Sequence, residues 1–168
     1  MMYQLPEIKP RKKPKQAYRK PEAVRELEEA LYLADCRKHP SIDGKYIARR
    51  KMRDDTSGGL TACIVAYAKL NGSFASRLNN TGIFRYGRYT RSTARRGLPD
   101  VLITGPDGRS IFVEVKVGRD RMSCYQEKIQ QEQQQSGGLY VVAHNFTDFR
   151  AWYNGLVPAG LHQQDIRS

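Results

Sequence analysis

The sequence contains no long apolar run. No stretch approaches the roughly 18 residues that a membrane-spanning helix needs, and no hydrophobic segment lies near the amino terminus. Paired cysteines are also missing. The 3 cysteines are widely spaced and include no Cys-x-x-Cys pair, which disfavours a disulfide framework or a zinc module. These absences predict an intracellular, cytoplasmic protein that does not enter a membrane.

Acidic residues are scarce in the middle of the chain, and none occurs between Thr56 and Pro99. The 168 residues include 29 Lys and Arg against 17 Asp and Glu, so the formal charge is +12 and the pI about 9.8. This excess suits a polyanionic partner. Charge alone does not separate nucleic-acid binding from ribosome binding, acidic-membrane binding or simple solubility.

The length fits one folded domain with additional segments. Residues 1–21 form a basic arm in which repeated prolines prevent a helix, so it either contacts phosphates or solubilises the chain. Residues 22–55 form an N-terminal helix, expected to end near residue 37, and a basic linker. Residues 56–156 form the main domain, and residues 157–168 a C-terminal tail. The linker holds a cluster that is a candidate DNA contact: Arg49, Arg50, Lys51 and Arg53.

Helical and extended patterns alternate through the main domain. A helix capped by Thr56 or Ser57 should reach Leu70, and a strand should follow at 74–78. A second extended stretch or long loop covers 83–96. The later elements are a hairpin within 100–117, a helix at 123–136, a buried strand at 139–143 and a terminal helix with an aromatic face. This order predicts an α/β fold with a mixed central sheet flanked by helices.

The hairpin carries an acid at the start of its first strand and another near the end of its second. Asp100 shares a face with Glu114 only if Thr104 pairs with Ser110, because side chains alternate along a strand. Pairing Thr104 with Arg109 instead would turn Asp100 towards the core. We therefore predict a loop of five residues, 105–109, or an equivalent bulge.

Two carboxylates on one face make an oxygen-rich site. Asp100, Glu114 and the backbone carbonyl of Val115 are the candidate ligands, and such ligands suit Mg²⁺ or Mn²⁺ better than zinc. A bound ion of this kind activates water and stabilises a leaving oxygen in phosphodiester hydrolysis. Lys116 would orient the attacking water or neutralise developing negative charge.

The same residues carry a resemblance to a known family. Gly97–Asp100 followed by Glu114–Lys116 resembles the signature of the PD-(D/E)xK nuclease superfamily, in particular its VRR-NUC branch and the related Holliday-junction resolvases. Residues 77–82 resemble an Arg-x-Asn-Ser-Gly strand end of that branch, and Ser123–Gln126 resembles its Ser-x-x-Gln helix start. The similarity runs from about Thr56 to Trp152, and it implies a restriction-endonuclease-like core.

The resemblance also implies a catalytic role for Gln126 near the scissile phosphate. Those nucleases commonly carry a further acid on the helix before the first core strand, and this chain has none there. Asp54 or Asp55 could replace it, as could the neutral oxygens of Asn79 or Asn80. Alternatively, a second metal site is absent.

Arginines and tyrosines gather between residues 83 and 96 with no acid to neutralise them. Arginine binds phosphate in a bidentate manner, and tyrosine stacks on unpaired bases. The candidate nucleic-acid-binding residues, of which Lys128 is included on charge alone, are Arg77, Asn80, Arg85, Tyr86, Arg88, Tyr89, Arg91, Arg95, Arg96 and Lys128.

The combined prediction is an enzyme, a Mg²⁺- or Mn²⁺-dependent DNA nuclease that cuts endonucleolytically. Structured or branched DNA follows as substrate from the resemblance alone. The alternatives are a non-catalytic DNA-binding protein on a degenerate nuclease scaffold and an RNA-directed nuclease. Cutting two opposed strands would require a homodimer, although the sequence marks no apolar interface.

Overall fold

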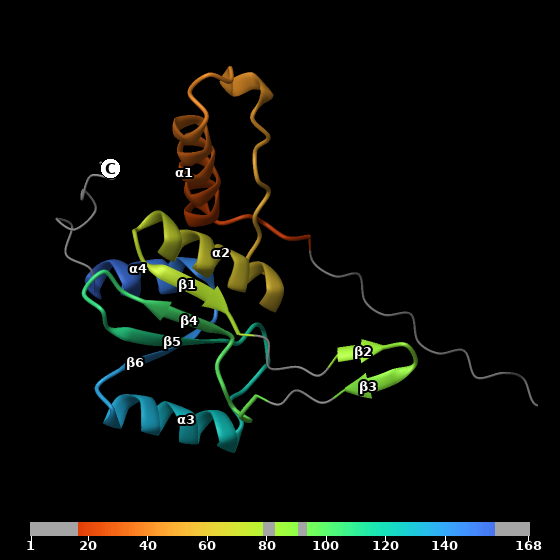
Figure 1. The fold of residues 1–168 in the computed structure, drawn as a ribbon, viewed down its shortest axis with the longest axis vertical. Helices are drawn as coiled ribbons and strands as arrows, with labels where there is room; N and C mark the ends of the chain where they lie inside the picture. The colour runs from red at the N-terminus through yellow and green to blue at the C-terminus, as the bar shows by residue number, and fades with distance from the viewer. Residues whose placement is uncertain (1–16, 79–82, 91–93, 157–168) are drawn as a thin grey trace, which may run out of the picture.

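A computed structural model describes residues 17–78, 83–90 and 94–156 of the chain (Figure 1). Most of the basic arm, Asn79, Asn80, Arg91 and the tail beyond Leu156 therefore lie outside the described residues. Within the described ranges, no helix combines the length and hydrophobicity needed to cross a bilayer.

A four-stranded sheet forms the centre of the molecule. Its strands are β1 (Phe74–Arg77), β4 (Val101–Thr104), β5 (Ser110–Val115) and β6 (Leu139–Ala143), in the order β1-β4-β5-β6. The first three strands run antiparallel, and β6 runs parallel to β5. The sheet is therefore mixed, and the predicted α/β class is confirmed.

Helices cover both faces of this sheet (Figure 1). On one face lie α2 (Ser57–Leu70) and α4 (Phe146–Leu156), and α1 (Glu22–Lys38) packs on that pair. On the opposite face lies α3 (Cys124–Gln135). The core lies between the sheet and α2, since Leu60, Ile64 and Val101 are fully buried there. The aromatic face of α4 joins this core, as predicted.

Local capping explains where the helices begin. Thr56 accepts a hydrogen bond from the backbone N–H of Gly59 at 3.1 Å, so α2 starts where the sequence predicts. The helix α3 begins with a capping box between Ser123 and Gln126. The first helix follows Pro21, whose fixed φ suits a helix start, and the side chain of Pro21 forms no cap.

The stretch after β1 contains a hairpin, where the sequence predicted an extended stretch or a loop. Its strands are β2 (Ile83–Arg85) and β3 (Arg88–Thr90), which pair in an antiparallel manner. Both turn residues have positive φ, +51° at Tyr86 and +73° at Gly87, the requirement of a two-residue hairpin turn. A Tyr-Gly pair is less typical of such a turn than Asn-Gly, so the sequence did not indicate a hairpin here. The hairpin stands away from the main sheet (Figure 1).

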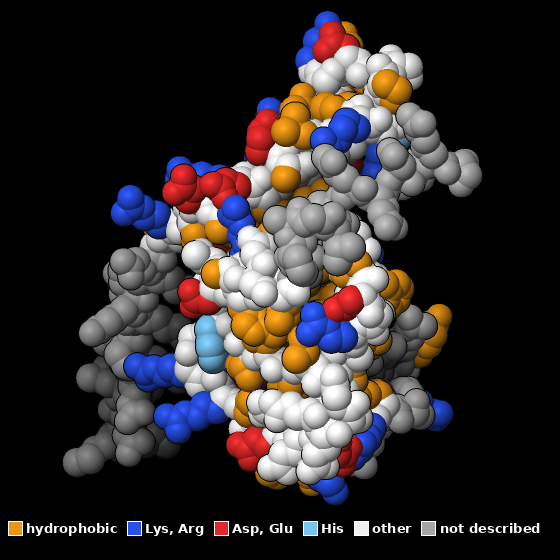
Figure 2. Space-filling view, turned by 90° about the vertical axis from the view of Figure 1, so that its left-hand side faces the viewer, with side chains coloured by type: hydrophobic (Ala, Val, Ile, Leu, Met, Phe, Trp, Pro, Cys, Tyr) orange, Lys and Arg blue, Asp and Glu red, His pale blue; other side chains and the backbone are white. Residues whose placement is uncertain are grey.

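The basic linker, together with the short 3₁₀ helix η1 (Gly44–Tyr46), returns along α1. Arg50 contacts Asp35 of α1 through two hydrogen bonds of 2.9 and 3.0 Å. Arg49 pairs with Glu29, also of α1, and Arg53 with Asp55. Basic and acidic side chains accordingly lie next to each other over the upper part of the face in Figure 2. The expected DNA contact of this linker gains no support, because three of its four cations are already paired.

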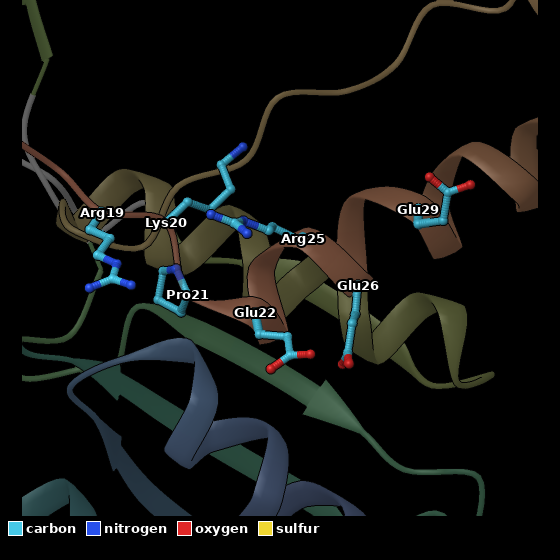
Figure 3. A pocket seen from close by; sticks show the side chains of 7 residues that line it. All are labelled: Arg19, Lys20, Pro21, Glu22, Arg25, Glu26 and Glu29. Carbon is cyan, nitrogen blue, oxygen red and sulfur yellow. The ribbon is translucent and has the colours of Figure 1, made fainter.

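A hollow at the start of α1 has the same mixed character. Arg19, Lys20 and Arg25 line it together with Glu22, Glu26 and Glu29 (Figure 3). Such a surface does not favour a phosphate, since its carboxylates oppose the basic side chains.

Candidate active site

The register of β4 and β5 sets the geometry of the site. Thr104 pairs with Ser110, so the connecting loop has the five residues predicted from the sequence. Continuing this register places Asp100 opposite Glu114. Both lie on the face that α3 covers, since Gln126 of α3 donates to the Glu114 carboxylate. The hairpin therefore brings the two predicted acids together.

Asp100 is anchored at the beginning of β4. Its Oδ2 accepts a hydrogen bond of 2.9 Å from the backbone N–H of Val115 on the neighbouring strand. Its backbone carbonyl accepts from Leu78 N–H at 2.8 Å, which extends the pairing with β1. The Asp100 carboxylate is thus fixed beside the strand that carries Glu114 and Lys116.

Glu114 is almost completely buried, with 2% of its surface exposed. Its Oε1 accepts hydrogen bonds from the side chains of Lys116 and Gln126. Its Oε2 is buried and has no hydrogen-bond partner among the described residues. Burial raises the pKa of Glu114 and the nearby Asp100 charge adds to this, while the Lys116 ammonium opposes both. A buried carboxylate oxygen without a donor favours a cation beside it.

Lys116 is also buried, at 6% exposure, and points to the acids. Its Nζ lies 3.0 Å from Glu114 Oε1 and 3.5 Å from Asp120 Oδ2. Burial alone lowers the pKa of this lysine, but the two carboxylates outweigh it, so the net pKa is raised. Lys116 is therefore a fixed positive charge rather than a base at neutral pH.

Gln126 reaches the site from the first turn of α3. Its Oε1 accepts from Ser123 N–H at 2.9 Å, while its Nε2 donates to Glu114. Gly97 lets α3 lie close to the start of β4, because a Cβ at this position would overlap the Tyr125 carbonyl. Its φ of +85° is also one that glycine adopts without strain. A second hydrogen bond links α3 to β5, since Gln133 Nε2 donates to Ser110 Oγ at 2.9 Å. These contacts bring the four predicted catalytic residues together.

Two residues of the site were not predicted. Asp120 contacts Lys116 from the turn after β5, and no periodicity marks it because the segment is irregular. Tyr140 pairs with Phe112 in register, so it lies on the Glu114 face, and its pKa is raised by burial and by the charges of Glu114 and Asp100. Alternation within β6 could have indicated Tyr140, had the parallel register been known.

Asp54 and Asp55, the candidate replacements for the acid that the resembling nucleases commonly carry on the preceding helix, form other contacts in this structure. Asp54 accepts hydrogen bonds from the Tyr18 hydroxyl at 2.8 Å and from Phe146 N–H at 3.1 Å, which join three segments. Asp55 pairs with Arg53. Among the residues described, no three His, Cys, Asp or Glu side chains cluster to hold a metal ion.

The predicted nucleic-acid contacts fall into two groups. Tyr86 and Tyr89 are exposed on the β2–β3 hairpin, at 102% and 64%. Arg95, in contrast, forms an ion pair with Glu132 of α3, and the Arg96 guanidinium lies 5.8 Å from the centre of the Tyr125 ring. The remaining described candidates are Arg77, at the end of β1, Arg85 and Arg88 in the hairpin, and Lys128 on α3.

Comparison with known proteins gives one structural match. A solved structure described as "VRR_NUC domain" aligns with 60% of this chain and 97% of its own length, at 20% sequence identity and a TM-score of 0.46. No protein-family model matches the sequence, and the curated proteins contain no match to it.

Proposed function

We propose that this chain is a divalent-metal-dependent nuclease that hydrolyses DNA phosphodiester bonds endonucleolytically. One observation carries the proposal. Glu114 is buried opposite Asp100, held by Lys116 and Gln126, and keeps one oxygen without a donor among the described residues. Lys116 and Gln126 both contact Oε1, so burial of Oε2 without a partner of its own is unfavourable, and a metal cation beside Oε2 would relieve it.

The donor set fits a hard cation. Asp100 and Glu114 offer carboxylate oxygens, the Val115 carbonyl is a candidate third ligand, and these oxygens match the preference of Mg²⁺ or Mn²⁺. When bound, such an ion makes a water more nucleophilic and stabilises negative charge on a phosphate.

The chain's own residues have separate roles around that ion. Lys116 holds a permanent positive charge where negative charge develops during hydrolysis, because its contacts raise its pKa. Gln126 fixes the rotamer of Glu114 by donating to Oε1, and the capping box in turn fixes Gln126. One carboxylate oxygen of Asp100 accepts a hydrogen bond from the Val115 N–H, which fixes the orientation of the Asp100 side chain. These roles support our proposal that phosphodiester hydrolysis takes place on the α3 side of the sheet.

The β2–β3 hairpin supports a nucleic acid as the substrate. It joins β1 to the segment that leads into Asp100, so it extends from the same end of the sheet as the acids (Figure 1). Phe84 pairs across the strands with Tyr89, and the two are 70% and 64% exposed. Exposed aromatic rings beside arginines can stack on bases while the arginines contact phosphates.

The test is cleavage by the purified full chain. Linear, circular, single-stranded and four-way-junction DNA, with a matched RNA set, are incubated with Mn²⁺ or Mg²⁺ and separately with EDTA. We expect cleavage of closed circular DNA with either metal and none with EDTA. Cleavage that persists in EDTA, or an Asp100→Asn variant that cuts at the wild-type rate, would rule out the proposed site.

A second candidate function is DNA binding without cleavage. It is favoured by the absence, among the described residues, of a third acidic metal ligand. Mn²⁺ titration calorimetry separates the two functions. Tight DNA binding without any Mn²⁺ heat that depends on Asp100 and Glu114 would support the binding protein.

A further inference from the structure

Tyr140 carries a hydroxyl group that is buried beneath the surface of the protein. It lies in β6 with 8% of its surface exposed, and its Oη is buried without a hydrogen-bond partner among the described residues. Burying a hydroxyl without a partner is unfavourable, and native proteins seldom leave one so. Phenylalanine would fill the same space without burying a hydroxyl group.

The register directs this tyrosine to the candidate active site. Tyr140 lies beside Phe112 on β5, and Val142 lies beside Glu114. Side chains two residues apart share a face, so Tyr140 is the diagonal neighbour of Glu114. The charges of Glu114 and Asp100 both raise the pKa of the Tyr140 hydroxyl. The phenol therefore stays neutral at neutral pH, and its oxygen has lone pairs that can accept a hydrogen bond.

Two buried oxygens without a hydrogen-bond partner thus occur on one sheet face of the described residues, Glu114 Oε2 and Tyr140 Oη. They are not hydrogen-bonded to each other. A hydrated cation satisfies both at once, because its charge attracts the carboxylate and its polarised water ligands donate hydrogen bonds to the phenol oxygen.

We propose that Tyr140 is a positioning residue whose hydroxyl oxygen accepts a hydrogen bond from a water ligand of the divalent cation held by Asp100 and Glu114. This inference rests on the proposed function, since it requires the metal site. It adds a residue from a third strand, so the site depends on the β5–β6 pairing as well as on the β4–β5 hairpin. Outer partners of this kind commonly contribute about 10- to 100-fold in metal affinity.

The experiment compares two buried tyrosines in the full chain. Tyr153 is fully buried, and its hydroxyl forms a 2.6 Å hydrogen bond with Ser73 Oγ. We make Tyr140→Phe and Tyr153→Phe and measure melting temperatures in EDTA. Tyr140→Phe is expected to melt at or above the wild-type temperature, because it removes an unsatisfied hydroxyl. Tyr153→Phe should melt lower, because it leaves Ser73 without its partner.

The second measurement is Mn²⁺ binding by calorimetry, without nucleic acid. Wild type and Tyr153→Phe should bind Mn²⁺ equally, and Tyr140→Phe about tenfold more weakly. Equal affinity of Tyr140→Phe and wild type, or a lowered melting temperature of Tyr140→Phe in EDTA, would overturn the inference and leave the metal site intact. Absence of Mn²⁺ binding by the wild type would overturn the metal site together with this inference.

Discussion

The side-chain amide of Gln126 links the first turn of α3 to the Glu114 carboxylate. Its oxygen completes the capping box with Ser123, and its nitrogen donates to the buried acid. One side chain thus serves both helix stability and site geometry. These two effects can be separated by comparing both members of the capping box.

Gln126→Ala and Ser123→Ala should each destabilise the chain by about 1 kcal/mol, since each removes part of the cap. Only Gln126→Ala also frees Glu114, and we expect its cleavage rate to fall about tenfold while Ser123→Ala retains most activity. Urea unfolding and single-turnover cleavage measure the two effects. Equal cleavage by the two variants would show that the Gln126–Glu114 contact does not matter for the reaction.

Lys116→Ala should reduce cleavage by about 100- to 1,000-fold, since it removes a fixed charge aimed at developing negative charge. DNA affinity should change little, because only 6% of Lys116 is exposed. Lys69→Ala is the control, as it removes an exposed lysine of α2, on the other face of the sheet. Cleavage rates, with circular dichroism to check folding, test this. A Lys116→Ala variant that cuts at the wild-type rate would remove this lysine from the mechanism.

Gly97→Ala should impair the site more than an equivalent change at Gly108. Both glycines have positive φ, +85° and +80°, so each alanine costs about 1–2 kcal/mol in backbone strain. A Cβ at Gly108 meets open space, whereas one at Gly97 overlaps the Tyr125 backbone and displaces α3. We expect Gly97→Ala to unfold more readily and to cut more slowly than Gly108→Ala. Equal losses in denaturation and cleavage would contradict the close approach of α3.

Tyr89→Ala should weaken binding of single-stranded DNA by about 1–3 kcal/mol, the usual loss of one base-stacking ring. Stability should be unchanged, because 64% of Tyr89 is exposed. Tyr46→Ala is the matched control, since Tyr46 is 75% exposed but lies in η1. Fluorescence anisotropy in EDTA at fixed salt measures the affinities. If both variants bind as wild type, the hairpin is not a base-contacting surface.

Cys63 should resist thiol reagents, while Cys124 reacts. Burial raises the pKa of Cys63 to about 12, so almost no thiolate forms at pH 8, whereas Cys124 is exposed. The same shift makes the free energy of unfolding fall as pH rises from 9 to about 12, because only the unfolded thiol ionises in that window. Labelling followed by mass spectrometry tests the first point. Rapid modification of Cys63 in the folded chain would contradict its burial.

Patterns among residues close together in the sequence predicted much of the geometry of the candidate site. Alternation in the hairpin required Thr104 to face Ser110 if Asp100 and Glu114 were to share a face, and that register is present. The capping residues Thr56 and Ser123 marked where their helices begin. These features depend on neighbours in sequence, so they can be read from it.

The tertiary structure alone decided which distant residues meet. Tyr140 shares a face with Glu114 only because β6 pairs in parallel with β5, and a parallel register leaves no local signal in the sequence. Arg49 and Arg50 of the linker form ion pairs with acids of α1, which no local pattern in the sequence indicates. The sequence by itself determined which side chains each strand carries. Packing decided which charged side chains are buried or paired, because burial and pairing depend on contacts throughout the chain.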